Sequence, residues 1–307
     1  MKIININPSI KRAIRETIAF FDLFDCPLTG FEIWQFLNIK CEYIQVLSAL
    51  EVLKNEKLIK EKNGYWFMRG RVEIFEVRRD RYNIAIDKFK RAGRTVRIFR
   101  YAPWVKMIAV GNIMGANNTH EDGDIDLFIV TSPGKIWLTR FFCASIAQIF
   151  GWRPRPGAEK NKICLSFFLS TNVMNLEKYK TRPDDIYFHY WLASLCPIYD
   201  TGGYYQKLIQ ENGWIYDYLP NWSSVVASER RGVHADISSF YFDIIEMFFS
   251  GLEKYVKNWQ LKRLPVTLKY LMNIDTRVVI NDNILKMHVN DRREEYYKRW
   301  SARVKQF

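Results

Sequence analysis

Two aspartates separated by a single residue carry the strongest chemical signal in this sequence. Asp124 and Asp126 stand at the start of an apolar run that continues to Val130. Because side chains alternate along a strand, both carboxylates are expected on one face, about 6 to 7 Å apart. Oxygen atoms at this spacing can share divalent cations. The pair therefore predicts a metal site at the beginning of a strand.

A glycine-containing turn lies upstream of this pair. Gly111 is followed by Asn112, and a second glycine stands at position 115. Glycine allows the backbone to approach a ligand closely, which favours phosphate binding through N–H groups. The turn and the aspartates together predict a site for a nucleoside triphosphate and its metal. The alternative is an ordinary turn beside a capped strand end, but a charge at Asp126 inside the apolar run argues against it.

The combined pattern resembles the signature of the nucleotidyltransferase superfamily, which includes DNA polymerase beta and the antibiotic nucleotidyltransferases. The resemblance rests on Gly111-Asn112 followed, after a spacer, by Asp124-Ile125-Asp126. It implies transfer of a nucleoside monophosphate from a nucleoside triphosphate such as ATP to a hydroxyl, with release of pyrophosphate. It also implies that Asp124 and Asp126 are the catalytic residues and hold Mg²⁺ or Mn²⁺, and that Gly111 and Asn112 bind the triphosphate.

Three further residues are candidates for nucleotide binding. Lys135 and Lys162 are expected to add positive charge beside the phosphates. Asp200 follows a segment that resembles the turn near the nucleotide pocket in several family members. Its alternative role is that of a cap at a helix end.

Two positions depart from the family pattern. Asn112 stands where serine is usual, although its amide can still donate to a phosphate. The family commonly adds a third carboxylate from a later strand, but the strand expected at 162–169 has Cys164 or Ser166 in that place.

Two alternatives to an active transferase follow: an inactive or weakened member acting as a nucleotide- or nucleic-acid-binding adaptor, and the toxin of a toxin–antitoxin pair. The candidate substitutes for the missing acid are Asp122, Asp184 and Asp185.

Residues 1–70 are predicted to form a winged-helix-like module. Three segments with apolar residues at helical spacing precede Asn63-Gly64, a dipeptide typical of a two-residue hairpin turn. Thr29 and Glu32 are expected to form a capping box for the second helix. The expected third helix exposes acidic side chains, which are unfavourable against a phosphate backbone. We therefore expect this module to contact a protein partner or to brace the chain rather than to read DNA.

The remaining elements give an α+β fold. A basic amphipathic helix is predicted over 71–104, and its basic face is either an RNA- or DNA-binding surface or simply solvated. The nucleotidyltransferase core is predicted over 105–200 as a mixed sheet flanked by helices, and residues 201–307 are predicted to be a C-terminal helical region. His288, just before the last expected helix, is interpreted as structural. The core elements are expected at 106–110, 125–131 and 163–169 for the strands and at 135–150 for the helix.

Composition limits the class of protein. The chain has 46 Lys and Arg against 33 Asp and Glu, a net charge of +13, which favours phosphate-rich partners. Its five scattered cysteines suggest reduced thiols rather than a disulfide framework. No signal-peptide h-region and no apolar run long enough to span a bilayer are found. We therefore expect a cytoplasmic location and no membrane partner.

Overall fold

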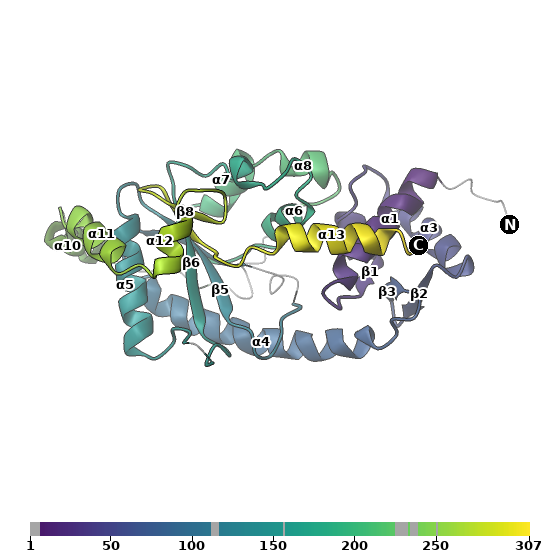
Figure 1. Cartoon of the computed structure of the whole chain (residues 1–307), viewed down its shortest axis with the longest axis horizontal. Coiled ribbons are helices and arrows are strands. Elements are labelled where there is room, and N and C mark those ends of the chain that lie inside the picture. The colour runs from purple at the N-terminus through teal and green to yellow at the C-terminus, as the bar shows by residue number, and fades with distance from the viewer. Residues whose placement is uncertain (1–6, 112–116, 156, 225–232, 234–238, 250) are drawn as a thin grey trace.

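The computed structural model describes residues 7–111, 117–155, 157–224, 233, 239–249 and 251–307. These residues form a mixed α+β fold. A helical N-terminal part and a larger sheet-based part are joined by one long helix, as Figure 1 shows.

The N-terminal part contains three helices and a small sheet. Its second helix begins at the predicted capping box, because Thr29 Oγ1 accepts from the backbone N–H of Glu32 while the Glu32 carboxylate accepts from that of Thr29. Asn63 and Gly64 both have positive φ, as the tight turn of a hairpin requires. The elements are α1 (Pro8–Asp22), β1 (Leu28–Thr29), α2 (Gly30–Gln35), α3 (Tyr43–Asn55), β2 (Ile59–Lys62) and β3 (Tyr65–Met68), with strand order β1-β3-β2.

The basic side chains of the long helix α4 (Ile74–Phe99) do not all lie on one exposed face. Arg78, Arg81 and Lys88 are buried. Arg78 donates to the carbonyl oxygen of Pro27 at 2.8 Å, and Arg81 pairs with Asp25 at 3.2 Å. The two arginines therefore join α4 to the N-terminal part instead of facing solvent, and Lys88 bonds to the loop that precedes β5 (Ile125–Thr131). The exposed bases of the helix are Arg79, Lys90, Arg94 and Arg97.

The central sheet has six strands among the described residues, in the order β7-β4-β5-β6-β9-β8. Strands β5 and β6 are parallel and are connected through α5 (Ile136–Ile149), whereas the other neighbours are antiparallel. The three core strands and the helix lie where the sequence predicts them. The strands are β4 (Val105–Val110), β5 (Ile125–Thr131), β6 (Ile163–Ser170), β7 (Cys196–Asp200), β8 (Val278–Ile280) and β9 (Ile284–Met287).

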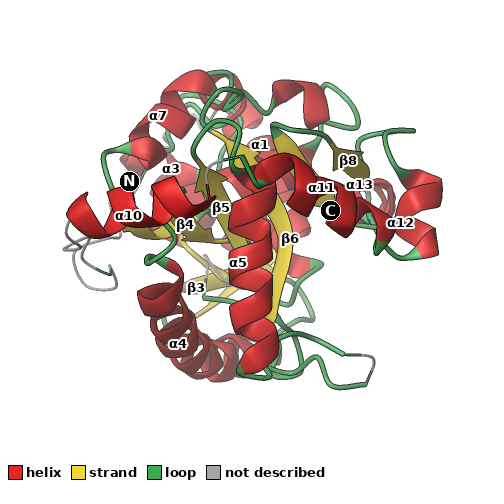
Figure 2. Ribbon diagram, turned by 90° about the vertical axis from the view of Figure 1, so that its left-hand side faces the viewer, coloured by secondary structure: helices red, strands yellow, loops and turns green. Residues whose placement is uncertain are grey.

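The two faces of the sheet pack against different helices. On β5, Leu127 and Ile129 belong to a hydrophobic cluster with α4 and α5, and Figure 2 shows α5 lying across the sheet. Phe128 and Val130 point to the other face and pack with residues of α1 and of the helices between 186 and 218. Those helices are α6 (Ile186–Ala193), α7 (Tyr204–Glu211) and α8 (Ile215–Tyr218), preceded by a short 3₁₀ helix at Glu177–Tyr179.

The region 201–307 is not purely helical. It contains the hairpin formed by β8 and β9, and β9 pairs with β6 in the central sheet. This hairpin corrects the expectation of a helical region; its strands are only three and four residues long and depend on a distant partner strand, so local sequence patterns do not reveal them. The other elements of the region are α10 (Ser239–Phe249), α11 (Glu253–Lys262), α12 (Val266–Leu271) and α13 (Arg293–Val304).

Helix α13 brings the C-terminal residues back to the N-terminal part, where it lies beside α1 in Figure 1. The indole N–H of Trp300 donates to the carbonyl oxygen of Glu16 at 2.9 Å, and Arg303 pairs with the buried carboxylate of Asp22. The N-terminal part therefore packs against later segments of the chain.

All five cysteines lie in the described part of the chain and are free thiols. In the same part, no helix combines the length and apolar character needed to cross a lipid bilayer.

Candidate metal and nucleotide site

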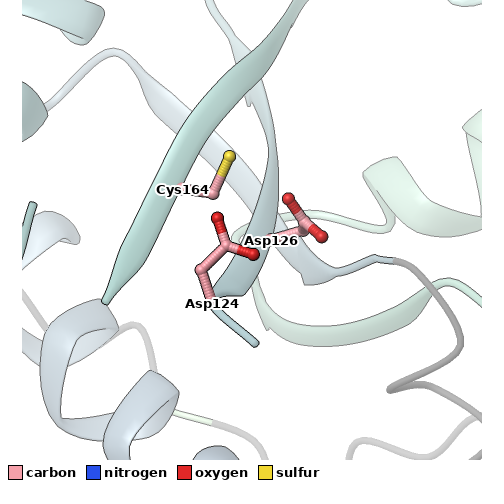
Figure 3. Close-up of side chains that lie close together, drawn as sticks. All are labelled: Asp124, Asp126 and Cys164. Atoms are coloured by element: carbon pink, nitrogen blue, oxygen red, sulfur yellow. The ribbon is translucent and has the colours of Figure 1, made fainter. Parts of the chain in front are cut away.

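The two aspartates and one cysteine meet where β5 and β6 begin (Figure 3). Asp124 immediately precedes β5, Asp126 is its second residue, and Cys164 is directly opposite Asp126 in the parallel register. One carboxylate oxygen from each aspartate and the Sγ atom of Cys164 all lie within 4.8 Å of one another. The oxygens are closer than strand spacing predicts, because Asp124 lies in the loop before the strand. The three side chains form the only such cluster of possible metal ligands among the described residues.

Gly111 lies beside this cluster, directly after β4. Its backbone N–H donates to the carbonyl oxygen of Asp126 at 3.0 Å. A Cβ atom at Gly111 would lie 3.9 Å from the Cβ of Asp126 and 3.5 Å from Nε1 of Trp191. The absence of a side chain at Gly111 leaves space next to Asp126. The N–H of Gly111 is already hydrogen-bonded to the carbonyl oxygen of Asp126, so it does not point outward as a donor for a phosphate. Asn112, the second residue predicted to bind the triphosphate, lies outside the described residues.

A buried lysine fixes the loop that carries Asp124. The ammonium of Lys88 on α4 donates to the carbonyl oxygens of His120 and Gly123 at 2.6 and 2.5 Å. Its side chain is almost completely buried. The hydrogen bonds hold the residues immediately before Asp124 against the long helix, so the position of this aspartate is set by a distant segment.

The cluster concentrates negative charge in a partly buried place. Burial and, after it, the charge of Asp126 raise the pKa of Asp124 to about 6. Burial and the neighbouring carboxylates also raise the pKa of the Cys164 thiol well above its ordinary value. Like charges that repel one another this strongly are stabilised by a bound cation. The donor set therefore fits a divalent metal ion.

A hydrogen-bonded chain leads from the cluster to a histidine that follows β9. The thiol of Cys164 donates to Oγ of Ser166 at 3.2 Å, and Ser166 Oγ lies 3.0 Å from Nε2 of His288. Burial is the main reason that the pKa of His288 is lowered to about 4, so its imidazole is neutral near pH 7. The Nδ1 atom is buried and has no hydrogen-bond partner in the described part of the chain.

A pocket of about 170 Å³ opens beside Asp126 on the same face of the sheet. Its walls come from the sheet, from α6 and from the segment between β9 and α13. At the side of the pocket formed by α13, Arg293 pairs with Asp185 at 2.9 Å and with Asp291 at 2.6 Å, which links α13 to the start of α6. The residues that line it next to the cluster are Gly111, Asp126, Phe167, Trp191, His288 and Asn290.

Sequence reasoning missed the contribution of His288 to this pocket. The histidine is more than 120 residues from Ser166 in sequence and reaches it only because β9 pairs with β6. The signal that could have found it is the short apolar run Ile284-Leu285 directly before it, which is strand β9.

Two of the predicted nucleotide-binding residues are not brought to the aspartates. Lys135 lies beyond the far end of β5, where its ammonium pairs with Glu246 and stands 5.8 Å from the ring centre of Trp104. Asp200 ends β7 opposite Met107, at the end of β4 away from Gly111. It accepts from two backbone N–H groups of α7, so it has the helix-capping role foreseen as its alternative.

Lys162 lies closer to the cluster but does not point to it. Its carbonyl oxygen accepts from the N–H of Ile125 at 2.7 Å, at the start of β5. Its ammonium donates to the carbonyl oxygen of Gly151 at 2.6 Å. The substitutes considered for the third acid do not join the cluster either: Asp185 caps α6 and pairs with Arg293, and Asp122 and Asp184 are exposed.

Comparison with protein-family models, curated proteins and solved structures found no match. A function for this chain is therefore inferred from the geometry and chemistry of the cluster and its pocket.

Proposed function

We propose that this protein is a metal-dependent nucleotidyltransferase that transfers a nucleoside monophosphate from a nucleoside triphosphate to a hydroxyl group. The observation that carries the proposal is the meeting of Asp124 and Asp126 beside Gly111, with ligand atoms within 4.8 Å. The spacing of these residues resembles the nucleotidyltransferase signature. The pocket next to Asp126 supplies room for part of a substrate.

The aspartates would hold Mg²⁺ or Mn²⁺, and their close approach and the raised pKa of Asp124 fit this task. A divalent ion bound there would neutralise charge on the triphosphate and assist an in-line displacement. The protein's own part is to hold the two carboxylates in place. Lys88 fixes the loop before Asp124, and the hydrogen bond from Gly111 fixes the backbone at Asp126.

The pocket wall contributes positive charge and an ordered surface. Lys286 and Arg293 line the pocket and are buried, while Arg292 is exposed at its edge. All three cations are paired with carboxylates, of Asp291, Glu295 and Asp185, so the attraction for an anionic substrate would come mainly from a divalent ion held at the cluster. His288, which is neutral near pH 7, adds a group that can accept a hydrogen bond.

The acceptor is proposed to be RNA. Lys90, Arg94 and Arg97 are exposed on α4 at spacings of four and three residues, which places them along one side of the helix. A basic stripe of this kind can track a phosphate backbone without reading bases.

A second candidate is a nucleotide-binding adaptor without transferase activity. It is favoured by the thiol of Cys164, which stands directly opposite Asp126 where a third carboxylate is expected for catalysis. In this case the aspartates and the pocket would bind nucleotide without turning it over.

The test is a labelling assay. The full chain is incubated with each NTP labelled at the α-phosphate, with Mg²⁺ or Mn²⁺, and with total cellular RNA or total protein. Label transfer is expected with the native chain and RNA, and not with Asp124→Asn plus Asp126→Asn. The matched control is Asp122→Asn, which changes an exposed acid of the same loop outside the cluster. Nucleotide binding without transfer to either pool contradicts the transferase and supports the adaptor.

A further inference from the structure

The ligand cluster contains a sulfur atom, and sulfur changes which metal suits the site. The Sγ of Cys164 lies within 4.8 Å of a carboxylate oxygen of Asp124 and of Asp126. Strand pairing sets this position, because Cys164 and Asp126 are opposite each other in the β5–β6 register. The cluster thus offers two hard oxygen donors and one soft sulfur donor.

These donors match a thiophilic ion better than a hard one. Mg²⁺ selects oxygen ligands in near-octahedral geometry, whereas Zn²⁺ accepts sulfur and carboxylate oxygen together. With bonds of about 2.3 Å to sulfur and about 2.0 to 2.2 Å to oxygen, a tetrahedral zinc ion holds its ligand atoms roughly 3.3 to 3.7 Å apart, about 1 Å closer than the limit within which the three atoms lie here. A small side-chain rotation therefore brings the three ligand atoms into bonding range. Three protein ligands would leave a fourth position open, as in catalytic zinc sites.

An outer hydrogen bond supports Cys164 as a ligand. Its Sγ lies 3.2 Å from Oγ of Ser166, which in turn lies 3.0 Å from Nε2 of His288. Hydrogen bonds of this kind orient metal ligands and increase their affinity for the ion. The chain extends from the thiol into the pocket wall, because His288 lines the pocket.

We propose that Cys164 is the third protein ligand of the metal held by Asp124 and Asp126, and that the site prefers Zn²⁺ to Mg²⁺. Binding replaces the S–H bond by a metal–sulfur bond, the proton passes to water, and no electron is transferred. The proposal deepens the proposed function, on which it rests for the role of the ion in nucleotide transfer. Metal binding itself is measured without nucleotide.

The first experiment uses Co²⁺ as a spectroscopic substitute for Zn²⁺ in the full metal-free chain. The native protein is expected to give a sulfur-to-cobalt charge-transfer band in the near ultraviolet, and added Zn²⁺ is expected to remove it. Cys164→Ser should lose the band, whereas Cys41→Ser, which changes a similarly half-buried thiol in the N-terminal part, should keep it. A native cobalt complex without this band, or an unchanged band in Cys164→Ser, overturns the proposal.

A second measurement needs no variant and so does not depend on whether Cys164→Ser folds. The native chain is alkylated with iodoacetamide with and without Zn²⁺, and each cysteine is followed by mass spectrometry. Zn²⁺ should slow the modification of Cys164 by at least about tenfold and leave Cys41 unchanged. Equal rates at Cys164 with and without Zn²⁺ contradict the proposal.

A third variant reverses the preference. Cys164→Asp supplies a third carboxylate in place of the thiolate, so Mg²⁺ affinity is expected to rise and Zn²⁺ affinity to fall, each by at least about tenfold. An unchanged order of affinities contradicts the role of sulfur. The outcomes separate the two proposals when the labelling assay is repeated with Zn²⁺: a cobalt–thiolate band without nucleotide transfer in Mg²⁺, Mn²⁺ or Zn²⁺ rejects the transferase alone, and transfer without this band rejects the cysteine ligand alone.

Discussion

The ammonium of Lys88 donates to the carbonyl oxygen of Gly123, one residue before the first candidate metal ligand, at a distance of 2.5 Å. Lys88→Met keeps most of the side-chain volume but removes this hydrogen bond and the one to His120. Each hydrogen bond to a charged group contributes about 1.5 to 3 kcal/mol to the free energy of unfolding. Part of the loss is offset, because methionine has no charge that must be buried when the chain folds. We expect the free energy of unfolding, measured by urea titration, to decrease by about 1 to 3 kcal/mol.

The same substitution should weaken Co²⁺ binding by about tenfold, because a supporting contact of a ligand loop is lost. The matched control is Lys90→Met, an exposed lysine two residues later on the same helix, which should change neither quantity. Tighter metal binding in Lys88→Met would show instead that repulsion between the ammonium and the ion dominates.

Asp124→Asn should stabilise the metal-free protein while abolishing metal binding. Folding raises the pKa of Asp124 from its ordinary value to about 6, so its charged form is less favourable in the folded state above that pH. At pH 7.5 we expect a gain on the order of 1 to 2 kcal/mol in the free energy of unfolding. Urea titrations of Asp124→Asn and Asp122→Asn check this, and an equal gain in both would assign it to net charge alone.

His189 should make the protein sensitive to acid. The ring is buried against Tyr218, its Nε2 has no hydrogen-bond partner within the described residues, and burial lowers its pKa to about 4. In the unfolded chain this histidine binds a proton at higher pH than in the folded protein. The free energy of unfolding is therefore at its full value above about pH 6.5 and decreases by about 2 to 3 kcal/mol as the pH falls to 4. His288 adds a similar decrease.

The measurement compares unfolding free energies at pH 7 and pH 4.5 in the native chain and in His189→Gln. The variant should show a smaller difference between the two pH values, whereas His120→Gln on the exposed loop should keep most of it. Identical pH dependence in His189→Gln and the native chain would contradict the role of this ring.

Arg293→Met should be strongly destabilising. The substitution leaves the carboxylates of Asp185 and Asp291 without the buried guanidinium that pairs with both. Removing one partner of a buried ion pair costs about 3 to 5 kcal/mol. Arg292→Met, the neighbouring exposed arginine paired with Glu295, should cost less than about 1 kcal/mol in the same urea titration. Similar midpoints for the two variants would show that the buried network contributes little.

The basic stripe on α4 predicts a salt-dependent contact with single-stranded RNA. Replacing Lys90, Arg94 and Arg97 by Gln should weaken binding and reduce the slope of log affinity against log salt by about 2, which is about 0.7 for each lost phosphate contact. Filter binding at several salt concentrations measures both. The control replaces three exposed lysines on α11 and α12, Lys254, Lys262 and Lys269, with the same change in net charge. Equal losses in the two triple variants would remove α4 as the binding surface.

The elements around the aspartates could be predicted because their signals are local. The apolar runs of β4, β5 and β6, and the hairpin turn at Asn63-Gly64, depend on neighbouring residues in the sequence. The two aspartates were placed on one face for the same reason, and the structure brings their oxygens together.

The features that were missed depend on contacts between distant segments. The sequence pattern predicts Lys88 as part of a basic helix surface. In the structure it is buried and donates to carbonyl oxygens of a loop more than 30 residues later. Lys135 is expected to add charge beside the phosphates, whereas it lies beyond the end of β5 opposite to the aspartates. His288 reaches the site only through the pairing of β9 with β6. No local pattern encodes these three relationships.

The position of the β8–β9 hairpin and of α13 has a consequence for biosynthesis. During translation, every candidate metal ligand is made at least 120 residues before His288 and Arg293, which line the pocket. A nascent chain that has reached residue 270 therefore contains the ligands but no closed pocket wall. The pocket beside Asp126 would therefore be complete only after these late segments leave the ribosome, and a prematurely terminated chain would lack it.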